Sequence, residues 1–204
     1  MGMSDVSAVT ITADTVALDA DGISVATSVG NNAALVIGGA LASGGAVALS
    51  HGRIVTILSA GNDAAKSFTV VGTDVNGAAQ TESITGANAG TATGTNYFLT
   101  IASITAVGNP AGNVSAGVNA SAADVIFAGR SRLKGIYLTS TATAGTVDFL
   151  NTSPSGTSIL GLSSVGDADA TRDVVIPEEG VLFKAGIYIE YTVSTFLTMT
   201  VFHA

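Results

Sequence analysis

The sequence predicts an all-β protein made of antiparallel strands, and three features of its 204 residues favour this class. Apolar and polar residues alternate with a period of two in many short segments, which is typical of half-buried strands. No segment sustains a helical period over several turns. Twenty-five glycines and several Asn- or Pro-containing clusters separate the alternating segments, as turns do. Short strands at this spacing indicate two antiparallel β-sandwich or jelly-roll-like domains.

The first half of the chain contains the clearest predicted hairpin. Ser67–Thr73 is rich in β-branched residues and is followed by Asn76-Gly77, which favours a type I′ turn. The polar segment Ala78–Thr85 is expected to pair back onto it. Tyr97–Val107 is predicted to be a long strand, with Gly112–Val118 as its antiparallel mate.

The second half repeats this pattern with larger apolar side chains. Gly186–Thr192 and Phe196–Phe202 both alternate cleanly and are expected to form a hairpin. Further strands are predicted at Leu133–Ser140, Thr146–Leu150, Ser158–Leu162 and Asp173–Ile176.

A change in composition near Ser121 predicts the domain boundary. The residues before it hold two cationic side chains, Arg53 and Lys66, and many small residues, whereas five cationic side chains follow. We therefore expect an N-terminal β domain over 1–122, which includes an extended arm of about 50 residues. A C-terminal β-sandwich is expected over 123–204.

The composition excludes several classes of protein. Only 11% of the residues are charged and 47% are hydrophobic, which is opposite to the composition of disordered chains. The net charge of −8 disfavours nucleic-acid binding. The uncharged run Ala33–Leu49 is interrupted by two Gly-Gly pairs, so we expect no membrane span there. Its many small apolar residues favour a contact with other subunits.

The sequence offers little catalytic chemistry. It has no Cys, which removes thiolate catalysis and Cys-based metal sites. Its two histidines, His51 and His203, lie in a predicted turn and at a strand end, too few for a zinc site. Nucleophile-elbow and phosphate-loop motifs do not occur. We therefore expect a protein that is not an enzyme and that needs no cofactor.

One acidic loop is a weak candidate for a metal site. Asp167 and Asp169 precede Asp173, and the three carboxylates would converge on a hard cation if the loop curled. The alternative is a solvated loop between two strands, which we favour because the loop supplies few ligands. No metal is therefore expected.

One cationic cluster is a candidate for a partner contact. Arg130, Arg132 and Lys134 would project to the same side of a strand. They would form a positive patch that docks an acidic partner surface. Alternatively, these side chains pair with carboxylates on neighbouring strands, such as Asp148 or Glu190.

Two long segments resemble modules of tailed-bacteriophage virion structural proteins. The run 53–118 contains SAGND, a hairpin of the form FTV-GTD-NG-AQTE-ITG, and a strand YF-T--SI that leads to GNVS-G. The second half contains LKGIYLTSTATAGTVDF and VVIPEEGVLFKAGIYIEYT and ends in TVF, which is similar to a second phage module. Together the two resemblances cover about three quarters of the chain, and neither includes a catalytic signature.

The resemblance implies a structural role in the virion. The expected protein is a capsid decoration or cement protein that binds the head exterior after synthesis in the host cytoplasm. Its partners would be the major capsid protein and copies of itself, as a homotrimer, with neither nucleic acid nor membrane involved. The alternative is a tail, neck or fibre component that attaches to a host surface. A non-viral surface module is disfavoured because no secretion signal is visible.

Overall fold

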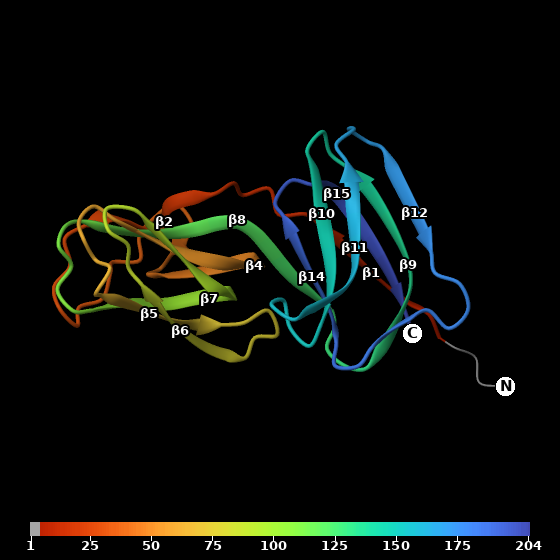
Figure 1. Cartoon of the computed structure of the whole chain (residues 1–204), viewed down its shortest axis with the longest axis horizontal. Helices are drawn as coiled ribbons and strands as arrows, with labels where there is room; N and C mark the ends of the chain where they lie inside the picture. Colours follow the sequence, from red (N-terminus) through yellow and green to blue (C-terminus); the bar gives the residue numbers. More distant parts are fainter. Residues whose placement is uncertain (1–4) are drawn as a thin grey trace. The chain divides into compact units, whose positions relative to one another are not determined.

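The computed structural model describes residues 5–204 and confirms the all-β class. The described residues form fifteen strands in two antiparallel sheets, and no helix. They fall into two compact units, shown in Figure 1. The discontinuous unit contains the residues up to Val16 together with Ser121–Ala204, and the inserted unit is Ala17–Ala120.

This division corrects the expected domains 1–122 and 123–204. The boundary near residue 121 is retained, but the first strand belongs with the C-terminal residues. Strand β1 (Ser7–Thr12) pairs with β15 (Phe196–His203) in one unbroken register, from Ser7 opposite His203 to Thr12 opposite Thr198. The N-terminal arm of about 50 residues is therefore wrong, because the backbone groups of β1 form a sheet ladder at the other end of the sequence.

The discontinuous unit contains two antiparallel sheets. The first has the order β1-β15-β9-β12, and β13 also pairs with β9. In the second, β11-β10-β14-β8, the last strand contributes only its residues from Ser121 onward. Large buried side chains come from both sheets, including Phe149, Tyr191 and Phe196. The strands not yet given bounds are β8 (Val114–Phe127), β9 (Ser131–Ser140), β10 (Ala144–Asn151), β11 (Thr157–Val165), β12 (Thr171–Val175), β13 (Val181–Phe183) and β14 (Ile187–Thr192).

The last two strands do not form the predicted hairpin. Strand β14 pairs with β10 and β8, whereas β15 pairs with β9 and β1 in the other sheet. The chain crosses from one sheet to the other between them. The rings of Tyr191 and Phe196 lie 4.9 Å apart at this crossing. The alternation of apolar and polar residues predicts which side chains of a strand are buried, but it does not predict which strand pairs with it.

The inserted unit is built on strands in the order β8-β4-β7-β5-β6. Strand β2 pairs with β8, and β3 pairs with β4. The expected pairing between the segments 97–107 and 112–118 is wrong, because the two edges of β7 are occupied by β4 and β5. The bounds are β2 (Asp19–Thr27), β3 (Ala42–Ser43), β4 (Ala46–Ser59), β5 (Ser67–Thr73), β6 (Ala79–Thr85) and β7 (Thr91–Val107).

The hairpin between β5 and β6 is confirmed, with a different turn. Thr73 is opposite Ala79, so the connection has five residues rather than two. Gly77 has a positive φ of 78°, whereas Asn76 is not among the positive-φ residues. Oδ1 of Asp74 accepts the backbone N–H groups of Asn76 and Ala78 at 2.8 and 2.9 Å. The Asp74 side chain thus replaces the predicted type I′ geometry with an Asx-type turn.

The small-residue run packs within the inserted unit instead of forming an arm. Leu35 and Ile37 are buried in its core, and the N–H of Leu35 donates to the carbonyl of Ile104 at 2.8 Å. Gly39 is required by close backbone approach, since a Cβ there would lie 2.3 Å from the carbonyl oxygen of Gly22. The apolar character of this run is therefore explained largely by the unit's own core.

Candidate functional site

The outer face of the sheet β1-β15-β9-β12 is a regular exposed surface of the discontinuous unit. Directly opposed residues of antiparallel strands point to the same side, and so do residues i and i+2. The pairing register therefore arranges twelve outward positions in three rows. We call them the threonine face: Ala8, Phe202, Gly135 and Val175; Thr10, Thr200, Tyr137 and Asp173; and Thr12, Thr198, Thr139 and Thr171.

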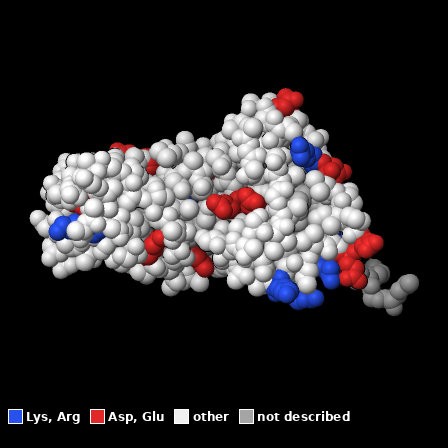
Figure 2. All heavy atoms as spheres, in the orientation of Figure 1, with Lys and Arg blue, Asp and Glu red and all other residues white. Residues whose placement is uncertain are grey.

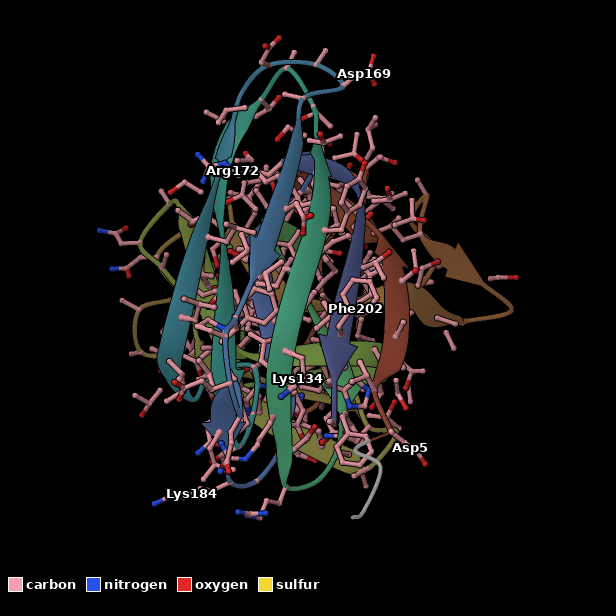
Figure 3. All side chains as sticks on the ribbon, turned by 90° about the vertical axis from the view of Figure 1, so that its right-hand side faces the viewer. Asp5, Lys134, Asp169, Arg172, Lys184 and Phe202 are labelled. Carbon is pink, nitrogen blue, oxygen red and sulfur yellow. The ribbon has the colours of Figure 1, made fainter. Side chains whose placement is uncertain are left out.

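The threonine face combines apolar exposure with hydroxyl groups. Val175 is 76% exposed, Tyr137 42% and Phe202 37%. A Cβ at Gly135 would lie 3.7 Å from Cδ2 of Phe202, so the aromatic ring covers the glycine. In Figure 3, Phe202 projects from β15, which lies between β9 and β1. This face presents large apolar side chains to solvent at one end and hydroxyls over the remainder.

The chemistry of this face suits binding to another protein surface. Six of its positions are Thr, and one, Asp173, carries a charge. Binding would therefore desolvate few charged groups, which are the costly ones to bury. Thr is branched at Cβ and has a restricted χ1, so binding immobilises little side-chain freedom. The hydroxyls of Thr10 and Thr200 already share a hydrogen bond of 2.9 Å, which joins β1 to β15 on this face.

The predicted cationic cluster lies at one end of β9 but is largely engaged. Nη2 of Arg132 forms a 3.0 Å salt bridge with Glu179, and Nζ of Lys134 donates to the carbonyl of Glu178 at 2.7 Å. Arg130 is exposed and precedes the strand. Figure 3 shows Lys134 near the lower end of the sheet. A hollow of about 300 Å³ is lined by Arg132, Lys134, Glu178, Glu179 and Ala204.

The carboxylates expected to neutralise this cluster lie elsewhere. Asp148 on β10 is directly opposite Glu190 on β14, in the other sheet. Oδ1 of Asp148 accepts the hydroxyl of Ser158 at 2.9 Å. Glu179 provides the ion pair of Arg132 instead, from the turn between β12 and β13. This ion pair could not be predicted from spacing in the sequence, because it forms only when the turn folds back along β9.

The three candidate metal ligands do not form a cluster. Asp167 and Asp169 lie in the connection between β11 and β12, and Asp169 has a positive φ of 62°. Asp173 lies within β12, opposite Tyr137 on the threonine face. Within residues 5–204, no group of three or more His, Cys, Asp or Glu side chains is placed to hold a metal ion.

His203 lies at a strand end as expected, whereas His51 does not lie in a turn. His51 lies within β4 rather than in a turn. His203 is buried, with Nδ1 3.2 Å from the hydroxyl of Ser131 and its ring 5.1 Å from that of Phe127. It packs at the end of the β15–β9 ladder, opposite Leu133.

An apolar hollow of about 290 Å³ in the inserted unit lies beside the turn between β3 and β4. Leu41, Ala46 and Ala48 line one side, and Ile101 and Ala102 the other. It lies within the small-residue run for which a subunit contact was expected. Over the part of the inserted unit that Figure 2 draws, charged side chains are few and scattered.

No family model, curated protein or solved structure matches this chain. Residues 5–204 form no helix with the length and apolarity of a membrane-spanning segment. The threonine face was not recognised from the sequence, although the alternating threonines of Thr10 and Thr12 and of Thr198 and Thr200 were a signal for it.

Proposed function

We propose that this protein is a structural virion protein of a tailed phage, of the capsid decoration or cement type. It binds the exterior of the preformed shell as an oligomer and contacts the major capsid protein through the threonine face. The proposal needs no catalytic group and no cofactor. It rests on the resemblance of the segments 53–118 and 133–202 to virion modules, and its contact surface rests on the structure.

The observation that carries the contact surface is a broad exposed sheet face with one charge among twelve positions. Strands are about 4.8 Å apart and residues i and i+2 about 6.8 Å apart, so twelve positions cover about 400 Å². A standard interface buries about 800 Å² on each partner. One face alone would therefore bind weakly, and an oligomer that engages several sites at once gains the affinity that a cement function requires.

The test is binding of the purified protein to preformed shells that lack it, measured by co-sedimentation. The double variant Thr139→Lys and Thr198→Lys adds two charges to the threonine face, and we expect it to lose binding at least tenfold. Thr81→Lys on β6 is exposed in the inserted unit and is the matched control. Unchanged binding of the double variant, with the control also unchanged, would remove the threonine face from the proposal.

The alternative position at the tail, neck or fibre is decided by image reconstruction of intact particles. Many copies spread over the shell support the cement function. A few copies at one vertex would contradict it and support host attachment instead.

A further inference from the structure

The outer edge of β1 carries backbone groups available for pairing. The N–H of Ala13 donates to the carbonyl of Leu197 at 3.2 Å, in the same register that places Ser7 opposite His203. Hydrogen-bonded pairs alternate along an antiparallel ladder. The N–H and C=O groups of every second residue, counted back from Ala13, therefore point toward β15. Those of Ala8, Thr10 and Thr12 point outward.

Strand β1 lacks the sequence features that prevent other edge strands from pairing with a further strand. Natural proteins protect edge strands with charges, Pro or bulges. At the opposite edge of the same sheet, β12 contains Arg172 and Asp173. Edge strand β11 has Gly161 and an irregular ladder with β10. In contrast, β1 reads SAVTIT, without charge, Pro or Gly, and its ladder with β15 has no register shift.

We propose that β1 is a homodimer interface, in which β1 of a second copy adds antiparallel to this edge. In the register that places Thr10 opposite Thr10 of the second copy, Ala8 is opposite Thr12. Each of these three residues then donates one backbone hydrogen bond and accepts one, so every outward group of the edge is paired. No other register with the same face outward uses all three residues on both copies.

The side chains fit this register as well as the backbone does. On the inner side, half-buried Val9 is opposite Ile11 of the second copy, an apolar cross-strand pair. On the outer side, Thr10 meets its own copy, which extends the row that contains Thr200. Asp5 precedes the strand and lies at opposite ends in the two copies, so the two Asp5 carboxylates are far apart.

This dimer deepens the proposed function, on which its biological role rests. The two five-stranded sheets become one sheet of ten strands, and the two threonine faces form one surface. Its area doubles to about 800 Å² by the strand spacing used above, which matches a standard interface. The interface is isologous and closes with two copies. It therefore predicts an even-numbered assembly rather than the homotrimer that the resemblance implies.

Light scattering of the purified chain tests the proposal without any shell. We expect twice the mass of one chain, with dissociation on dilution. Thr10→Pro removes an outward N–H and leaves the ladder to β15 intact, as edge positions allow. We expect this variant to be a folded monomer by circular dichroism. Thr171→Pro makes the same change at an outward position of the guarded edge β12, and should remain a dimer. A monomeric or trimeric native chain, or a dimeric Thr10→Pro variant, overturns the proposal.

A cross-link gives a readout that does not depend on tolerance of Pro. The chain has no Cys, so Thr10→Cys introduces a single thiol. Hydrogen-bonded partners have Cα atoms about 5.5 Å apart, within the range of a disulfide. Mild oxidation should convert Thr10→Cys to a covalent dimer and leave Thr171→Cys monomeric on non-reducing gels. Equal cross-linking of the two variants contradicts the proposal. Absence of the dimer would not contradict the proposed binding to shells. Shell binding is tested separately, with the double variant Thr139→Lys and Thr198→Lys.

Discussion

The phenolic hydroxyl of Tyr191 donates a hydrogen bond to Oδ2 of Asp124 over 3.2 Å. Its oxygen also accepts the backbone N–H of Asp14 at 3.2 Å. One side chain on β14 thus joins β8 to the segment that follows β1. Because β1 is an edge strand with a single neighbouring strand, this link helps to hold it in the discontinuous unit.

Replacing Tyr191 by Phe should destabilise the protein. The change keeps the ring but leaves the buried N–H of Asp14 without this acceptor, which costs about 1–3 kcal/mol. Urea unfolding followed by circular dichroism measures the loss. Tyr137→Phe removes the hydroxyl of a 42%-exposed tyrosine and is the matched control, with an expected change below about 0.5 kcal/mol. Equal effects of the two variants would contradict a special role for Tyr191.

The stability of the protein at alkaline pH should depend on the hydroxyl of Tyr191. Burial, followed by the nearby charge of Asp124, raises the pKa of Tyr191 above its ordinary value of 10.0. The unfolded chain therefore releases this proton at lower pH than the folded chain. The contribution of Tyr191 to stability is complete below pH 10 and is lost as the pH rises toward the folded-state pKa. Above pH 10, the unfolding free energy of the native chain should fall more steeply than that of Tyr191→Phe. Parallel curves would show that Tyr191 does not titrate in this way.

Glu82 should stabilise β7 where its register with β4 shifts, between Thr93 and Tyr97. Its Oε1 accepts the N–H and the hydroxyl of Thr95 at 2.6 and 2.9 Å, and Oε2 accepts the N–H of Asn96 at 3.3 Å. Hydrogen bonds to a charged group contribute about 1.5–3 kcal/mol. Glu82→Ala should lower stability by about that amount and speed amide exchange at Thr95. Glu82→Gln keeps one acceptor oxygen and should lose less, while Thr81→Ala serves as the exposed control. Amide exchange at Thr95 that is the same in Glu82→Ala as in the native chain would refute this role.

Asp63 should be a structural residue of the inserted unit. It is fully buried, and its Oδ1 accepts the N–H of Ala111 at 2.7 Å, which joins two loops. Asp63→Ala removes this acceptor and should cost about 1–3 kcal/mol. Asp63→Asn retains the acceptor and buries no charge, so it should be the milder change in thermal melting. A milder Asp63→Ala would show that the hydrogen bond to Ala111 is not stabilising.

The sequence by itself determined the strand content and several strands almost to the residue. Ser67–Thr73 was predicted with the bounds that the structure has, and its partner differs by one residue. Both predictions depend on period-two alternation and on a nearby turn, which are local properties. The change near Ser121 also located one unit boundary, since composition is read along the chain.

Only the tertiary structure decided which strands are neighbours. The pairing of Ser7 with His203 joins the two ends of the described chain, and no local signal encodes it. The same holds for β14 and β15, which alternate alike and still enter different sheets. The threonine face exists because four strands from distant parts of the sequence align their outward residues. Alternation specifies which side chains are buried, whereas the choice of partner depends on long-range packing and backbone pairing.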